Sequence, residues 1–244
     1  MATTIRGKWS GEGNRIRYYD SANNNETVKV IADVFFSDDF LGKAFDVTNW
    51  WTALDVSAAG LTTPVLVADG ASGLLSLPLD ATSEVQLSGV TWGDHRPLIL
   101  NQGLVFEARL ALSVLPTGAV VFCAGLCGDH NAAVNTVAES IWFRADGSGA
   151  ITVETDDTVN ETSVIATGVT LTAGLFAVLK IDCSDITSVK FYINGSQVAA
   201  GTTFNMSQVA ALKLQPVVRI GKEAAATTVG TVQLDYIRAW QNRA

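Results

Sequence analysis

The chain has 244 residues, enough for one β-sandwich domain with a substantial core. Charged residues make up only 16% of it, below the roughly 25% typical of soluble domains, which favours surface buried against other subunits over the alternative of a large two-sided core. The formal net charge of −8, with Lys and Arg scattered along the chain, argues against nucleic acid as a partner.

Residues 1–34 differ from the rest of the chain. Lys and Arg outnumber Asp and Glu there by five to four, whereas the remainder carries 11 basic against 20 acidic residues. NRIRYYD and ETVKVIAD flank the turn-forming SANNN, so we expect two strands that make an N-terminal β-hairpin arm. A lone hairpin is only marginally stable in water, so the arm needs a surface on its own domain, a sister subunit or a larger lattice. The opening MATTIRGKWSGEG has no apolar stretch after its positive charge, so we expect no secretory signal and synthesis in a cytosol.

From residue 35 onward, short β-rich runs alternate with turn signals, and we expect an all-β antiparallel architecture. The expected strands and hairpins cover residues 104–112, 119–126, 140–155, 175–183, 188–199 and 231–240. Asn194-Gly195 is typical of a two-residue hairpin turn. One short helix is expected in NMSQVAALKLQ, residues 205–215, capped by Asn205 or Ser207 and ended by Pro216.

The charge-free stretch of residues 110–128 has about the ~20-residue length of a membrane span. Pro116, Thr117 and Gly118 in its middle instead favour a turn between two strands, so no membrane partner is expected. The chain has three cysteines, which cannot all pair with one another, and a reduced intracellular state is the simplest interpretation.

Alternation assigns side chains to the two faces of each strand. In strand 104–112 the expected core-facing residues are Phe106, Ala108, Leu110 and Leu112. The closing strand is apolar on both faces, as a central strand would be. We expect one of its faces to carry Val232, Leu234, Tyr236 and Trp240, and the other to carry Ile237 and Ala239. Two packed sheets are the natural result.

Four segments resemble the concanavalin A-like jelly roll shared by legume lectins, laminin-G-like modules and family 16 glucanases. They are FSDDFLGKAFDVTNWWT at residues 36–52, FEARLAL at 106–112, VKFYINGSQVA at 189–199 and LDYIRAWQ at 234–241. The resemblance covers roughly residues 35–243 and implies a jelly-roll β-sandwich of two antiparallel sheets. It says little about function, because each motif consists of strand and turn signals. The segment RGKWSGEGNRIRYYDSANNNETVKVI is similar in style to N-terminal segments of tailed-bacteriophage virion proteins.

A retaining glucanase needs a nucleophile and an acid/base about 5 Å apart. Family 16 places them on one strand as Glu-x-Asp-x-x-Glu or Glu-x-Asp-x-Glu, and neither pattern occurs in this sequence. Glu107 is followed by Arg109 where the family has an aspartate, and Glu154 is followed by Asp156 and Asp157 but by no glutamate at the required spacing. We therefore expect no catalytic residues, and we interpret the second acidic run as a solvated turn.

The soft metal ligands Cys123, Cys127 and His130 lie close together in the sequence. Residues four apart on an extended strand are ~13 Å from each other, so we expect buried strand cysteines rather than a zinc site, unless the strand bends at Gly125. The second histidine, His95, and His130 each follow an aspartate, but no Gly-x-Ser-x-Gly motif accompanies them, which argues against a serine hydrolase.

The family 16 resemblance also implies a structural calcium ion in some members, between the first and last strands of the sandwich. Asp38 or Asp39 with Asp235 would match that site, and the alternative is that Asp235 accepts a backbone hydrogen bond. We expect no metal and no other cofactor, with calcium as the open alternative.

Glycan binding without cleavage is a second alternative. Aromatic faces make sugar platforms, and the candidates are Trp50, Trp51, Trp92 and Trp142, although large aromatic residues are more often part of a core.

Together these features favour a non-enzymatic virion structural protein of a tailed bacteriophage, a capsid decoration or cement protein made in the host cytoplasm and located on the capsid surface. The jelly roll would form an outward knob in a homo-oligomer, with a trimer favoured, while the arm binds the major capsid protein by strand addition or apolar contacts. The expected contact residues are Trp9, Arg15, Arg17, Tyr18 and Tyr19, since aromatic residues and arginine concentrate in interface hot spots; packing of the arm on its own domain is the alternative. The rival functions are a tail or fibre protein that binds a host glycan and a family 16-like glycoside hydrolase.

Overall fold

The computed structural model describes the backbone of residues 5–10, 15–20, 25–27 and 34–243, and the side chains of residues 34–243 apart from Asn135. This part of the chain consists of β-strands, turns and loops, with one 3-10 turn at Val134–Thr136. The expected all-β architecture is confirmed.

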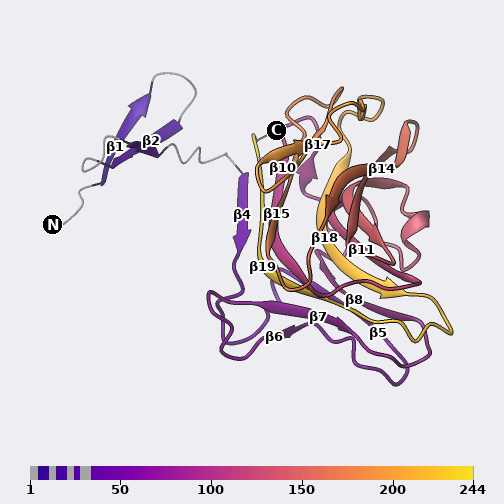
Figure 1. The fold of residues 1–244 in the computed structure, drawn as a ribbon. Helices are drawn as coiled ribbons and strands as arrows, with labels where there is room; N and C mark the ends of the chain where they lie inside the picture. The colour runs from indigo at the N-terminus through magenta and orange to yellow at the C-terminus, as the bar shows by residue number, and fades with distance from the viewer. Residues whose placement is uncertain (1–4, 11–14, 21–24, 28–33, 244) are drawn as a thin grey trace.

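Two eight-stranded antiparallel sheets form the body of the molecule and face each other (Figure 1). The sheet that we call the β19 sheet has the order β17-β16-β15-β10-β19-β7-β6, with β4 also paired to β19. Its strands are β4 (Val34–Asp38), β6 (Val65–Leu66), β7 (Leu75–Leu79), β10 (Val105–Val114), β15 (Ala177–Asp182), β16 (Lys190–Ile193), β17 (Ser196–Val198) and β19 (Gly230–Gln241).

The β18 sheet has the order β14-β13-β12-β11-β18-β8-β5, with β9 also paired to β18. Its strands are β5 (Thr52–Val56), β8 (Gln86–Thr91), β9 (Leu98–Ile99), β11 (Val120–Cys127), β12 (Glu139–Asp146), β13 (Ala150–Asp157), β14 (Glu161–Thr170) and β18 (Lys213–Lys222).

The hydrophobic core fills the space between the two sheets. The four side chains expected to face it from β10 are all fully buried, and Phe122 of β11 and Phe143 of β12 meet them from the β18 sheet. Phe143 packs edge-on against Phe191 of β16, with ring centroids 5.3 Å apart, so the two sheets are joined by aromatic contacts as well as aliphatic ones.

The strands and turns that the sequence predicted are present. The stretch 110–128 contains the end of β10, a turn in which Gly118 has a φ of +54°, and β11. No helix in the described residues is long and apolar enough to cross a membrane. Asn194 and Gly195 have φ values of +50° and +80°, the left-handed pair that a tight hairpin between β16 and β17 requires.

The helix predicted for residues 205–215 is wrong. Residues 208–211 form a turn, and Lys213–Lys222 is the central strand β18, paired with β11 on one side and with β8 and β9 on the other. Pro216 lies between the residues that pair with β9 and those that pair with β8, so the strand passes through a proline without losing these pairings. Long-range pairing here overrides the local helix signal.

The closing strand is central, as predicted, but its two faces were assigned wrongly. Arg109 pairs with Tyr236 and Leu110 with Leu234, so Asp235 is an extra residue and forms a β-bulge. Leu234 and Ile237 therefore both face the core, whereas Tyr236 and Trp240, which the alternation had placed beside Leu234, are only partly buried.

The N-terminal segment forms a three-stranded antiparallel sheet of β1 (Ile5–Ser10), β2 (Arg15–Asp20) and β3 (Asn25–Thr27). The expected hairpin around SANNN corresponds to β2 and β3, and β1 adds a strand that was not predicted. Within the described residues this sheet pairs with no strand of the two larger sheets. The side chains of the five expected contact residues lie outside what the structure describes; the first is on β1 and the other four are on β2.

Candidate functional site

The candidate carboxylate Glu154 lies on the face of the β18 sheet turned away from the core. Glu154 on β13 is 8% exposed, and its Oε2 accepts a hydrogen bond from Arg144 Nη1 at 3.2 Å. Arg144 Nε donates to Asp146 at 2.8 Å, so one guanidinium joins the two carboxylates. Glu154 therefore faces the Arg144 guanidinium, whereas a retaining glycosidase needs two carboxylates about 5 Å apart that flank an accessible sugar.

The residues between β11 and β12, which we call the 128–138 loop, cover the centre of that face. Val134 and Val137 from this loop form a second apolar cluster on the sheet, with Cys123, Cys127, Trp142 and Val217. The 3-10 turn of the loop projects from the β18 sheet on the side away from the β19 sheet (Figure 1). The middle of the outer face is therefore packed with side chains.

Arg219 on β18 holds the loop in place. It is 5% exposed and donates to the carbonyls of Asn131 and Ala132, both at 2.6 Å, and its Nη1 lies 3.1 Å from His130 Nε2. The backbone N–H of His130 also donates to Asp94 Oδ1 at 2.8 Å. Burial and the charge of Arg219 lower the pKa of His130 to about 4, so this imidazole is neutral at pH 7.

Glu107, the other candidate carboxylate, lies on the outer face of the β19 sheet. Its Oε1 accepts a hydrogen bond from the Tyr236 hydroxyl at 2.9 Å. Burial and the Glu107 carboxylate raise the pKa of Tyr236 to about 12, which is the opposite of what an activated nucleophile needs. Asp235, which the bulge turns toward this side, is buried and pairs with Arg109 instead of forming a second acid beside Glu107.

The residues once considered for metals do not converge. Cys123 and Cys127 are buried on one face of β11, and burial raises the pKa of both thiols, in the case of Cys123 to about 12. The described residues hold no group of three His, Cys, Asp or Glu that could bind a metal ion. Asp235 binds Arg109 and Asp38 accepts two hydrogen bonds of its own, so the alternative calcium set is not assembled.

The four tryptophans considered as sugar platforms differ sharply in exposure. Trp51, Trp92 and Trp142 are 2%, 9% and 1% exposed and belong to the apolar clusters. Trp50 is 56% exposed, so it is the one whose ring face a ligand can reach.

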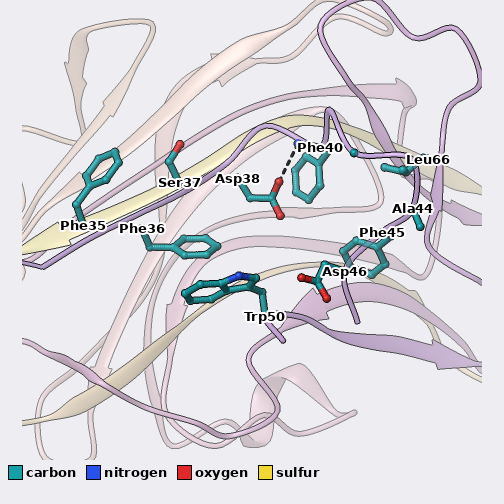
Figure 2. A pocket seen from close by; sticks show the side chains of 11 residues that line it. Phe35, Phe36, Ser37, Asp38, Phe40, Ala44, Phe45, Asp46, Trp50 and Leu66 are labelled. Carbon is teal, nitrogen blue, oxygen red and sulfur yellow. Dashed lines mark hydrogen bonds between the residues drawn. The ribbon is translucent and has the colours of Figure 1, made fainter. Parts of the chain in front are cut away.

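Trp50 borders a pocket of about 450 Å³ between β4 and the loop that follows it. Figure 2 shows the rings of Phe36, Phe40, Phe45 and Trp50 placed around this space. The Phe36 and Trp50 rings are 5.2 Å apart, and Phe36 is also 4.9 Å from Trp92 in an edge-on contact. The exposed Trp50 ring therefore rests on an aromatic cluster that continues into the core.

Two carboxylates, from Asp38 and Asp46, point into the same pocket (Figure 2). Asp38 accepts hydrogen bonds from the Phe40 N–H at 2.8 Å and from Trp51 Nε1 at 2.7 Å. Phe40 has a left-handed φ of +53°, a strained conformation for this residue that the first of these bonds helps to hold.

Asp46 Oδ1 accepts from the backbone N–H groups of Thr48 and Asn49, at 3.1 and 3.0 Å, and the Asn49 side chain donates to both carboxylate oxygens. These hydrogen bonds, that of the Asn49 side chain first, lower the pKa of Asp46, so it is ionised at neutral pH. Sequence reasoning did not single out Asp46; its spacing from Asn49 was the available signal, and this spacing marks a turn rather than a pocket.

No protein-family model matches this chain, and no curated protein matches it. Solved structures do match. The carbohydrate recognition domain of Emp47p aligns with a TM-score of 0.55 and 8% identity, over 85% of this chain and 96% of that one. An endo-β-1,3-glucanase from Pyrococcus furiosus aligns with a TM-score of 0.57 and 13% identity, over 86% of this chain and 94% of that one.

A β-1,3-1,4-glucanase, or lichenase, derived from a mouse hindgut metagenome aligns with a TM-score of 0.57 and 9% identity, over 85% of this chain and 99% of that one. Such low identities establish the fold and nothing finer. The fold is used by proteins that recognise carbohydrates and by proteins that cleave them, and function has to be argued from the side chains. The protein has a concanavalin A-like jelly-roll β-sandwich.

Proposed function

We propose that this protein is a non-enzymatic structural protein of a tailed-bacteriophage virion, a capsid decoration or cement protein. The observation that carries the non-enzymatic part is the outer face of the β18 sheet, where Glu154 is paired with Arg144 and the 128–138 loop packs over the neighbouring strands. A retaining glycosidase instead needs two carboxylates about 5 Å apart that flank an accessible sugar.

Attachment to the capsid through the N-terminal segment is supported by its separate sheet. β1 and β3 are the outer strands of this sheet, and an outer strand has an edge that can pair with another chain. We propose the major capsid protein as the partner and Trp9, Arg15, Arg17, Tyr18 and Tyr19 as contact residues. The small share of charged residues, 16%, supports further contacts between copies, for which we favour a trimer on the capsid surface.

A deletion of residues 2–30 tests the attachment, because it leaves β4, which begins at Val34, in place. The deleted protein should keep the urea midpoint of the full chain and fail to co-sediment with phage heads. A matched control is Tyr192→Ala, which removes a tyrosine from the outer face of the sandwich and should leave co-sedimentation unchanged. Normal co-sedimentation of the deletion variant would refute the proposed role of the segment.

Glycan binding at the pocket is the second candidate function, and the exposure of Trp50 favours it. An open tryptophan beside two carboxylates offers a stacking platform and polar groups at one site. A glycan array with the full chain and with the Trp50→Ala variant tests this candidate. Glycan binding that is lost in the variant supports it, whereas the absence of any bound glycan on the full chain contradicts it.

The hydrolase alternative has its own test. We expect no release of reducing ends from laminarin or agarose. Activity that is abolished by Glu154→Gln would overturn the proposal of a non-enzymatic protein.

A further inference from the structure

We propose that the pocket beside Trp50 binds the ammonium group of a cationic ligand, either a quaternary ammonium such as choline or the protonated amine of an amino sugar. The inference rests on the second candidate function in taking this pocket as a ligand site, and it adds the charge of the group that the site selects.

The aromatic composition of the pocket is the first argument. Five aromatic residues line one space of about 450 Å³, and the rings of four of them, Phe36, Phe40, Phe45 and Trp50, lie around it (Figure 2). Aromatic faces carry partial negative charge and attract cations within about 6 Å of the ring centroid, tryptophan most strongly. Because the rings of Phe36 and Trp50 are already in contact at 5.2 Å, little conformational freedom is lost when a ligand settles against them.

Charge is the second argument. The residues that line the pocket include Asp38 and Asp46 and no Lys, Arg or His. The donors described for these two carboxylates are backbone N–H groups, an indole and an amide, all of them neutral. Lys43, on the same loop, is exposed and is not among the lining residues. The pocket therefore holds two negative charges that its own walls do not neutralise.

The hydrogen bonds that Asp46 already accepts favour a cationic ligand over a neutral sugar. A carboxylate offers about four lone-pair sites, and Asp46 already uses four contacts with Thr48 and Asn49. Three of these four contacts fall on Asp46 Oδ1, so a neutral hydroxyl that needs a directional acceptor finds little capacity at this oxygen. A cation needs no free lone pair, because it is attracted by the net charge of the carboxylate and by the ring faces.

The experiment compares probes of the same shape and different charge, titrated into the full chain and followed by nuclear magnetic resonance or calorimetry. Choline should bind about tenfold more tightly than its uncharged isostere 3,3-dimethylbutan-1-ol. Glucosamine should likewise bind more tightly than N-acetylglucosamine, whose nitrogen carries no charge. Which of choline and glucosamine binds more tightly identifies the source of the ammonium group. Added salt should weaken both charged ligands.

Substitutions at two residues test the site itself. Trp50→Ala should weaken choline about tenfold and Trp50→Tyr should restore part of the loss, while Asp46→Asn keeps the shape of its turn and removes the charge, and should also weaken choline. The matched control is Asp185→Asn, since Asp185 likewise accepts the N–H two residues on, that of Thr187, and lies outside the pocket. All variants should keep the unfolding midpoint of the parent chain within a few degrees.

Four results would overturn the inference. Equal binding of choline and its isostere, or an Asp46→Asn variant that binds choline normally, would show that charge plays no part. If N-acetylglucosamine binds as tightly as glucosamine, the result supports glycan binding at the pocket and contradicts selection of an ammonium group. Binding of neither charged nor neutral probes would remove both.

Discussion

Replacing Gln215 by leucine tests how firmly the loop over the β18 sheet is held. Gln215 is fully buried on β18, and its Oε1 accepts from the N–H groups of Trp92 and Asp94 at 3.0 and 3.2 Å. Its Nε2 donates to Asp94 Oδ1 and to the carbonyl of Gly128, both at 2.8 Å. One side chain thus ties the residues after β8 to the first residue of the 128–138 loop.

The cost follows from the groups that leucine would leave without partners. The Trp92 N–H and the Gly128 carbonyl are buried, and an unsatisfied buried group costs about 1–3 kcal/mol. The Asp94 groups are partly exposed and can bind water, and burial of the leucine recovers roughly 1 kcal/mol. We expect a net loss of about 3 kcal/mol, which lowers the Tm of a chain of this size by roughly 6–12 °C.

Urea unfolding and amide hydrogen exchange measure the two consequences. The variant should unfold at lower urea, and the amides of residues 128–138 should exchange faster than those of β15 in the same sample. Gln233→Leu is the matched control, because Gln233 lies half-buried on β19 and makes no side-chain hydrogen bond within the described residues. A loss below about 1 kcal/mol for Gln215→Leu, or unchanged exchange in the loop, would refute the reasoning.

Three further predictions concern the same sheet. Cys123 of the native protein should resist alkylation at pH 8, since burial raises the pKa of its thiol to about 12; its rapid modification would contradict the packed outer face. The pKa of His130 is lowered to about 4 by burial and by Arg219, against about 6.5 in an unfolded chain, so this group costs stability as the pH falls from about 6.5 to 4. In the His130→Gln variant, the urea midpoint should therefore fall less over this pH range than in the parent chain. An unchanged pH dependence would contradict the assignment of this effect to His130. Gly125→Ala places a Cβ 2.3 Å from the Ile141 carbonyl oxygen and should lower the free energy of unfolding in urea by about 3 kcal/mol. A normal midpoint would mean that β11 and β12 can move apart at this position at no cost.

Much of the fold follows from local patterns. The strands at residues 104–112 and 119–126 and the Asn194-Gly195 turn were predicted because alternation and turn chemistry act over a few neighbouring residues. The same patterns failed at Asp235, where one extra residue reverses the alternation, and at residues 205–215, where strand pairing replaces a weak helix signal. A bulge and a partner strand are both properties of two segments, and neither can be read from one.

The candidate site was within reach only in part. The sequence named Trp50, Asp38 and the absence of a glutamate pair, but Trp50 and Trp51 are adjacent and identical in type, and only the structure shows that one is 56% exposed and the other 2%. The bond from Arg144 to Glu154, the closure of the outer face by Arg219, and the meeting of Asp46 with Phe36 in one pocket had no sequence signal that was recognised.

By itself, then, the sequence determined an all-β chain with a core-facing row of side chains on its main strands and no glucanase motif, since these features depend on the order of neighbouring residues. The tertiary structure decided which polar and aromatic side chains are accessible: Arg219 is buried under the 128–138 loop, while Trp50 is open beside β4. The physical reason is that exposure and the neutralisation of charge depend on what lies opposite a residue. In an antiparallel sandwich the opposite strand is often more than a hundred residues away, as Trp92 and Gln215 are.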